Sequence, residues 1–420
     1  MAKLKRALWL LETTICGVGI ILGAGIYALI GKAAGMAGNA VWISFVIAAI
    51  VAGLSGLSYA ELASMFPKAG AEYEYVRNAF NKRLAFVIGW LIALSGIVGA
   101  TTVALGFGGY FEAITGVPTL IAAVALVLML TALIGYGVKE AAWFAIVGTL
   151  FEAGGLLIVI AISIPHLGNV DYLEMPSMDG VFAAAALVFF AYIGFEEMTR
   201  MAEEVKQPEK NMPRALILAI AITTLLYIIV AISAISVVDY RVLAESNSPL
   251  ADVVSAAWTS DAFFAFSIIA LFATANTVLL IMMAASRIIY GMAESGALPK
   301  PLAYVNPSRR TPLVAVAAVG ILTAGFFLVG GIQEVANLTN LTVFITFIAI
   351  NASLIKLRYD APKAYRAFKV PLSIGRFPVL PFLAIITTLF MAINVGTTTI
   401  AYGIALLIIG ICISYLNKQI

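Results

Sequence analysis

The sequence predicts an all-α integral membrane protein with twelve transmembrane helices. Hydrophobic residues make up 62% of the 420 residues, charged residues only 11%, and the mean hydropathy is +1.04. A soluble domain carries roughly 25% charged residues, so a chain this apolar cannot cover a surface that faces water. The composition therefore excludes a disordered chain, a collagen-like repeat, a disulfide scaffold and a soluble nucleic-acid binder.

Twelve apolar runs approach the ~20 residues that a helix needs to cross the hydrocarbon core of a bilayer. A tight turn near Thr397–Thr399 separates the last two. The predicted spans are about 8–31, 40–64, 84–111, 117–136, 141–164, 180–199, 215–237, 262–293, 312–330, 334–355, 378–396 and 399–417.

The basic residues predict the orientation of these spans, because short cytoplasmic loops carry an excess of Lys and Arg. With the N-terminus inside, every Lys and Arg except Lys32 and Arg241 falls on the cytoplasmic side. The basic N-terminus and the first apolar run resemble a signal peptide, but Glu12 lies within the run and no cleavage pattern follows. We therefore expect a multi-pass protein of the cell membrane with both termini in the cytoplasm.

Two spans contain features that interrupt a helix. The first span carries Gly17, Gly19, Gly23 and Gly25 within nine residues, and each glycine costs a helix ~1 kcal/mol against alanine. Close packing between helices is the alternative explanation, since small residues are common at such interfaces. The sixth span carries Gly194 among aromatic residues, followed by two glutamates. Charges at this depth are costly and are usually functional.

These two spans open successive groups of five helices, and this pairing predicts a five-plus-five inverted repeat with a binding site near the middle of the membrane. We expect one membrane domain over residues 1–420, with repeats at 8–164 and 180–357 and two extra helices at 378–417. Unwound backbone in lipid must face a cavity or a ligand. Free N–H groups at a half-helix start favour a carboxylate, and free carbonyls favour an ammonium group or a cation.

Five short motifs, in order along nearly the whole chain, resemble those of the amino acid–polyamine–organocation (APC) superfamily of amino acid permeases. The resemblance implies the five-plus-five leucine-transporter-like fold and amino acid transport. The motifs are Gly19–Ile26; Ser58–Leu62 with Pro67–Tyr73; Gly137–Lys139; Phe190–Glu196 with Ala202–Pro208 and Asn211–Arg214; and Ser286–Arg287 with Ala293–Pro299.

The resemblance also implies a substrate site at the two breaks. Backbone N–H groups of Gly23, Ala24 and Gly25 would bind the substrate carboxylate, with alanine at 24 where many relatives have serine. The carbonyls of Ile21, Phe190 and Ile193 would hold the amino group, and the Phe190 ring would close over the substrate.

Several polar residues in the spans are candidates for coupling or gating. Glu152 stands where proton-coupled relatives often carry a lysine, and a carboxylic acid in an apolar site favours its neutral form and could carry a proton. Glu196 matches a family glutamate linked to gating or proton coupling. Both could instead be structural. Hydroxyls of Thr274 and Thr277 could line a sodium site, but Asn276 between them departs from the usual pattern, so a proton is the favoured coupling ion.

The sequence thus predicts a secondary active transporter of amino acids, with proton symport favoured and amino acid exchange as the alternative. An ion channel is disfavoured by the paired breaks, and a membrane enzyme by the lack of nucleotide, metal or catalytic motifs. We expect no cofactor, no nucleic-acid partner and a functional monomer in the lipid bilayer. No charged residue is obviously placed for a substrate side chain, which favours neutral or broad substrates.

Overall fold

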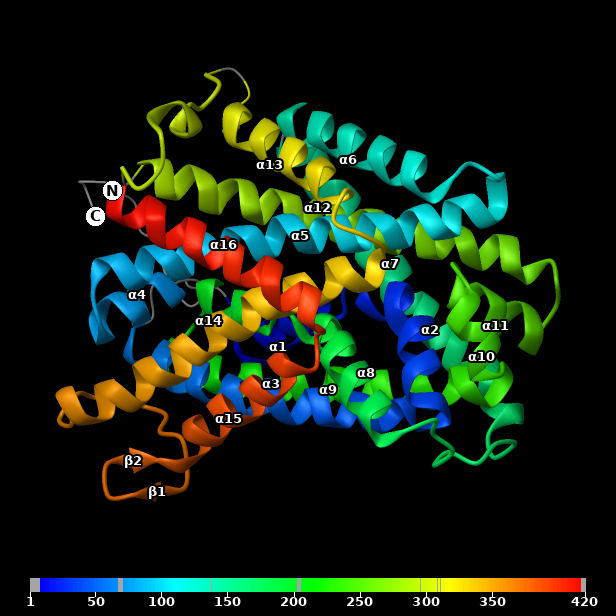
Figure 1. The fold of residues 1–420 in the computed structure, drawn as a ribbon, viewed down its shortest axis with the longest axis horizontal. Coiled ribbons are helices and arrows are strands. Elements are labelled where there is room, and N and C mark those ends of the chain that lie inside the picture. The colour runs from blue at the N-terminus through cyan, green and yellow to red at the C-terminus, as the bar shows by residue number, and fades with distance from the viewer. Residues whose placement is uncertain are drawn as a thin grey trace.

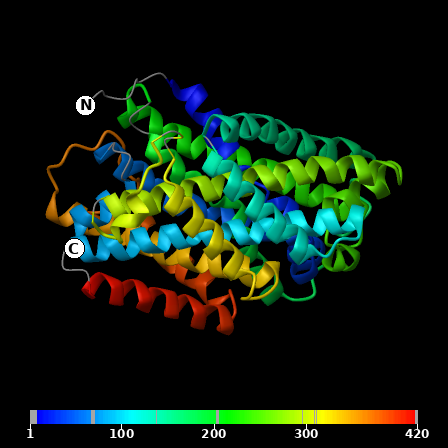
Figure 2. The ribbon, with the colours of Figure 1, turned by 90° about the horizontal axis from the view of Figure 1, so that it is seen from above.

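The computed structural model describes residues 8–66, 71–136, 138–201, 205–294, 296–307, 309 and 311–416, and it is built almost wholly of helices. The long helices run along one common direction, and the polypeptide reverses between the two ends of the bundle (Figure 1, Figure 2). The helices of the first half are α1 Leu10–Ile21, α2 Gly25–Ala37, α3 Val41–Met65, α4 Ala71–Ala79, α5 Lys82–Thr115, α6 Thr119–Tyr136 and α7 Val138–Ser163.

The second half repeats the pattern of one broken helix followed by long helices. Its helices are α8 Met178–Val188, α9 Pro208–Val237, α10 Tyr240–Glu245, α11 Pro249–Ala257, α12 Ala262–Glu294, α13 Leu313–Phe326, α14 Ile332–Asp360, α15 Val379–Ile393 and α16 Thr397–Leu416. Short 3-10 segments are η1 Gly38–Ala40, η2 Ile164–His166, η3 Phe189–Tyr192, η4 Phe195–Met201 and η5 Lys300–Ala303. Strands β1 Ser373–Ile374 and β2 Phe377–Pro378 form a small antiparallel hairpin.

A helix lies within each predicted span, and the two spans predicted to be interrupted are the two that break. The turn between the last two helices was predicted near Thr397–Thr399, but α15 ends at Ile393 and Thr397 already begins α16. Gly396 supplies the turn with a φ of 93°, which a residue with a side chain rarely adopts.

Nine helical segments of the described part of the chain are long and apolar enough to cross a membrane. Helices α1, α13 and α15 are also apolar but shorter, so the number of twelve crossings stays a prediction, as does the inverted repeat. Many side chains on α6, α15 and α16 are exposed and apolar, whereas α3, α5 and α14 bury most of their residues. This distribution is that of an all-α membrane protein, with central helices surrounded by helices that face lipid.

The basic connections gather at one end of the bundle. Helix α4, the connection between α12 and α13, and the connection between α14 and α15 lie at the same end of the bundle as the C-terminal end of α16 (Figure 1, Figure 2). Helices α10 and α11 lie at the opposite end. This arrangement agrees with the charge pattern of the sequence, which assigns the first end to the cytoplasm.

Candidate functional site

The first helix break lies at Leu22–Ala24, between the end of α1 and the start of α2. Gly25 begins α2 where the two breaks meet. A Cβ atom at Gly25 would lie 3.0 Å from the Cα of Ala191 and 3.2 Å from the Phe190 ring, closer than real side chains normally pack. Glycine at this position therefore lets the backbone of the first break touch the second.

The second break begins where α8 ends at Val188 and passes through the 3-10 turn η3 to Ile193 and Gly194. Gly194 has a φ of 125°, a conformation that favours glycine, and its N–H donates to the Glu196 Oε2 at 3.0 Å. The Asn340 amide of α14 donates to the carbonyls of Ala186 and Leu187 at 2.7 and 3.1 Å. Side chains thus satisfy backbone groups that the broken helix leaves unpaired.

Tyr227 of α9 joins the two breaks. Its fully buried hydroxyl lies 2.8 Å from the carbonyl of Ile21 and 3.0 Å from the carbonyl of Ala191. One hydroxyl proton can serve only one carbonyl at a time, so the bond is shared between the two broken helices. Neither Tyr227 nor Asn340 was among the predicted site residues; a polar side chain inside an apolar span was the signal available in the sequence.

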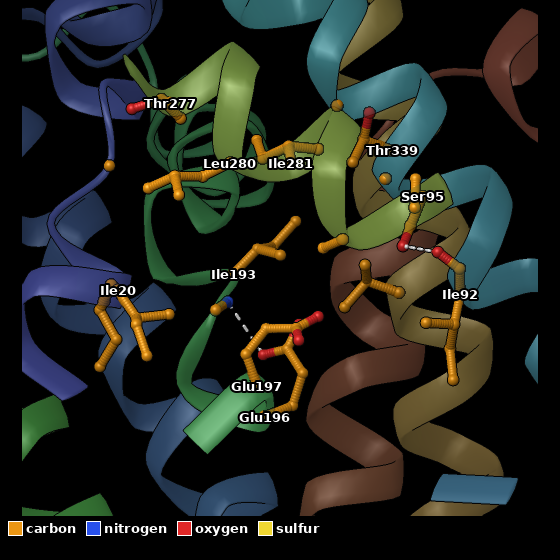
Figure 3. Close-up of a pocket in the computed structure, with 18 of the residues that line it drawn as sticks. Ile20, Ile92, Ser95, Ile193, Glu196, Glu197, Thr277, Leu280, Ile281 and Thr339 are labelled. Carbon is orange, nitrogen blue, oxygen red and sulfur yellow. Dashed lines mark hydrogen bonds between the residues drawn. The ribbon is translucent and has the colours of Figure 1, made fainter. Parts of the chain in front are cut away.

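A cavity of about 510 Å³ lies against both breaks. Eight of the predicted substrate-site and coupling residues line it: Ile21, Gly23, Gly25, Glu152, Phe190, Ile193, Glu196 and Thr277. Ala24 is buried beside the cavity without lining it. Figure 3 shows Thr277 beside the first break and Glu196 and Glu197 at the far end of the cavity.

The two other predicted residues of α12 do not line the cavity. The Thr274 hydroxyl donates within its own helix to the carbonyl of Ala270 at 2.7 Å. The Asn276 amide points to α7, where it lies 3.3 Å from the Thr149 hydroxyl. The helical period explains the difference, because neighbours on a helix point in different directions.

The first break places backbone N–H groups beside the cavity. The N–H of Ala24 donates to the Thr277 Oγ1 at 2.9 Å. Among the described residues, the N–H groups of Gly23 and Gly25 have no hydrogen-bond acceptor, although both residues line the cavity. The start of α2 carries the partial positive charge of a helix N-terminus. The break can therefore receive an anionic group such as a carboxylate.

A short chain of hydrogen bonds links this backbone to Glu152 of α7. The Glu152 side chain is 2% exposed, and its Oε1 lies 3.2 Å from the Thr277 Oγ1 that accepts from Ala24. The same hydroxyl lies 3.1 Å from the carbonyl of Ala273. The Thr277 proton can therefore point either to Glu152 or to its own helix.

The carbonyls of Ile21 and Phe190 at the breaks each accept one hydrogen bond within the protein. Ile21 accepts from Tyr227, and the Phe190 carbonyl accepts from the N–H of Ile193 at 3.3 Å. Each carbonyl oxygen has a second lone pair, so both can still accept from an ammonium group. The ring of Phe190 is buried between Gly25 and Gly99 of α5, at the contact between the breaks and the cavity wall.

The cavity extends from the breaks toward one end of the bundle. On α12 its lining runs from Thr277 to Ile288, and on α5 from Gly99 back to Ile92. Glu72 of α4 and Arg287 lie at this end, on the side of the basic connections. Apolar side chains supply much of the wall: Ile20, Ile92, Leu280, Ile281, Val343 and Phe347.

The other side of the breaks is closed by close packing. The Lys32 Nζ of α2 donates to the carbonyl of Ala244 at 2.7 Å, which ties α2 to α10. A Cβ atom at Gly31 would collide with the carbonyl oxygen of Leu243. The Tyr110 hydroxyl of α5 donates to the carbonyl of Tyr27 at 3.0 Å. Access to the cavity is therefore from the end of Glu72 and Arg287.

No group of three or more His, Cys, Asp or Glu side chains that could hold a metal ion occurs in the part of the chain that the structure describes. The polar groups at the breaks are instead backbone amides and carbonyls, two carboxylates and hydroxyls. Such a set suits a small zwitterion or a proton.

Comparisons with known proteins identify the family of the chain. A family model described as amino acid permease matches residues 8–413. The chain is 31% identical to the branched-chain amino acid permease BcaP of Bacillus subtilis (strain 168), over 99% of this chain and 94% of the relative. It is also 31% identical to the methylthioribose transporter of the same organism, over 96% of this chain and 91% of the relative.

A more distant relative is the vacuolar cationic amino acid transporter 4 of Arabidopsis thaliana, 28% identical over 88% of this chain and 65% of the relative. The names of these relatives cover three kinds of substrate. Sequence similarity to these relatives therefore does not identify the substrate of this chain.

Proposed function

Because the chain belongs to the amino acid permease family of the APC superfamily, we propose that it is a secondary active transporter of neutral amino acids. The carboxylate of the substrate binds the N–H groups of Gly23 and Gly25, and its ammonium group binds the free lone pairs of break carbonyls. One observation carries the proposal: these two N–H groups lack an acceptor among the described residues, and both glycines line a cavity of about 510 Å³.

The apolar wall supports a neutral substrate. A cationic side chain would lose its hydration against Ile92, Leu280 and Ile281 unless a carboxylate paired with it. Glu196 and Glu197 lie at the far end of the cavity, away from the first break. Methylthioribose has neither a carboxylate nor an ammonium group, so the helix start of α2 would gain little from it.

Transport by alternating access is supported by the one-sided cavity. With the orientation that the basic residues favour, the cavity opens to the cytoplasm and the packing of α2 on α10 closes the outside. In this conformation the substrate can leave to the cytoplasm while the outer side stays closed. The reverse conformation would open the contact between α2 and α10.

Coupling to protons is supported by the chain Glu152–Thr277–Ala24. An ionised Glu152 lies near the amides that would hold the substrate carboxylate, and two negative charges in a buried site repel each other. A protonated Glu152 removes this repulsion. Proton and amino acid therefore each favour binding of the other, which is the thermodynamic condition for symport.

Purified protein in proteoliposomes tests this function. Radiolabelled leucine should accumulate inside when the outside is made acidic, and a protonophore should abolish the accumulation. Uptake only into vesicles preloaded with amino acid would establish exchange in place of symport. Absence of both, with a folded protein, would refute amino acid transport.

A further inference from the structure

The connection between α14 and α15, residues 361–378, is a basic segment outside the transport cavity. It carries Lys363, Arg366, Lys369 and Arg376, and it contains no Asp or Glu. Its last part is the hairpin β1–β2, in which Ile374 pairs with Phe377 across the turn Gly375–Arg376. Gly375 has a φ of 62°, as the first position of such a two-residue turn requires.

A buried charge cluster fixes this connection to the membrane helices. Glu61 of α3 is fully buried, and its carboxylate receives the Arg358 guanidinium at 2.7 and 2.5 Å. The Arg366 Nε lies 3.0 Å from the same carboxylate, and the N–H of Val370 donates to it at 2.8 Å. Buried charges persist only when paired in this way, so residues 366–370 are held firmly rather than loosely.

The remaining cations and three of the large side chains of the connection are exposed. Lys363, Lys369 and Arg376 are exposed. Tyr365, Leu372 and Ile374 are 75%, 66% and 76% exposed, so three large side chains with apolar surface lie among these cations. We call the exposed set of Lys363, Tyr365, Lys369, Leu372, Ile374 and Arg376 the hairpin platform.

The platform is continuous with a surface that faces lipid. The ring of Phe377 on β2 packs on Phe382 of α15 with centroids 5.4 Å apart. Phe382 and Ile386 are themselves exposed on α15, which begins at Val379, directly after β2. A residue so close to the start of a membrane helix lies at the level of the lipid headgroups.

The hairpin lies at the edge of the bundle, at the end that holds the other basic connections (Figure 1, Figure 2). Phospholipids on this side of a membrane carry negative headgroups, which attract clusters of Lys and Arg next to a membrane helix. Apolar side chains among such cations enter the interface between headgroups and acyl chains.

We propose that the hairpin platform binds anionic phospholipid headgroups of the surrounding membrane, with Leu372 and Ile374 inserted beside them. The cations provide the charge complementarity, and the Glu61 cluster holds the platform in place. Binding is independent of the transport cavity, because none of the platform residues lines it.

Native mass spectrometry of the detergent-purified full chain tests the charge contribution. The variant Lys363→Gln/Lys369→Gln/Arg376→Gln should bind phosphatidylglycerol on the order of tenfold more weakly than the wild type, because each Lys or Arg near an anionic lipid surface strengthens binding to that surface. Phosphatidylcholine adducts should be unchanged. The matched control is Lys82→Gln/Lys210→Gln/Lys300→Gln, which removes three exposed cations at the starts of α5, α9 and η5, on the side to which the charge pattern also assigns the platform. Equal phosphatidylglycerol retention by both variants would overturn the proposal.

A second measurement tests insertion directly and does not depend on the charges. Ile374→Cys is labelled with an environment-sensitive fluorophore after Cys16 and Cys412 are replaced by serine. In vesicles of phosphatidylglycerol and phosphatidylcholine, spin-labelled lipids should quench the fluorophore and aqueous iodide should not. Quenching by iodide alone would place Ile374 in water and overturn the proposal.

Discussion

Replacement of Glu152 by glutamine isolates the charge that we propose for coupling. The two links of 3.2 and 2.9 Å place the carboxylate within about 6 Å of the Ala24 nitrogen. A substrate carboxylate bound beyond this amide would lie roughly 8 Å from Glu152. At an effective dielectric constant of about 20, two negative charges at that distance repel by about 2 kcal/mol. This energy corresponds to an affinity change of about thirtyfold.

The wild type should therefore bind leucine up to about thirtyfold more weakly as the pH rises and Glu152 loses its proton. Glu152→Gln keeps the neutral size and shape, so it should bind leucine with the affinity of the protonated wild type at every pH. It should also lose accumulation driven by a pH gradient and retain exchange. Equilibrium binding of radiolabelled leucine and uptake into proteoliposomes, both against pH, measure these effects.

Three further variants make the test specific. Glu334→Gln makes the same chemical change at an exposed acid of α14 and should keep the wild-type pH profile. Thr277→Val removes the hydroxyl between Glu152 and Ala24 and should weaken leucine binding, whereas Thr277→Ser should restore it. A wild-type pH profile with uphill accumulation in Glu152→Gln would refute the reasoning and make Glu196 the next candidate.

Three other substitutions test the two breaks. Gly25→Leu should abolish leucine binding in a protein that still purifies as a folded monodisperse species, because its side chain would fill the space against Ala191 and Phe190; normal binding would remove the site from this break. Phe190→Ala should raise the apparent KM of uptake about tenfold by opening the cavity wall to water, and unchanged kinetics would move the pocket elsewhere. Tyr227→Phe leaves two buried carbonyls short of a donor, which costs about 1–3 kcal/mol, so the Tm should fall; an unchanged Tm would contradict the shared bond.

The sequence predicts the helices well because a helix that crosses a bilayer needs about 20 consecutive apolar residues, and such runs are easy to recognise. Each predicted span contains a helix. Gly23, Gly25 and Gly194 lie at the two breaks as predicted, whereas Gly17 and Gly19 lie within the unbroken helix α1. The family of the chain, which the motifs indicated, is confirmed by the match over residues 8–413. Short elements outside the spans, such as α4 and the hairpin β1–β2, were not predicted because they carry no long apolar pattern.

The site was predicted in part. Glycine content could locate the first break, but it could not show that Thr277 rather than Thr274 faces it, since both threonines lie in the same span. The partners of the freed carbonyls come from distant helices, as with Asn340 and Tyr227. These hydrogen bonds between helices depend on how the helices pack together, and a single sequence does not show which helices are in contact.

The central claim is that backbone amides at the Gly23–Gly25 break bind the carboxylate of a neutral amino acid. Competition against radiolabelled leucine uptake in proteoliposomes tests it most directly, with leucine, leucinamide and methylthioribose as competitors. Unlabelled leucine should compete fully, while leucinamide, which lacks the carboxylate, and methylthioribose should compete at least about a hundredfold more weakly. Equal competition by leucine and leucinamide, or uptake of methylthioribose in place of leucine, would contradict the account.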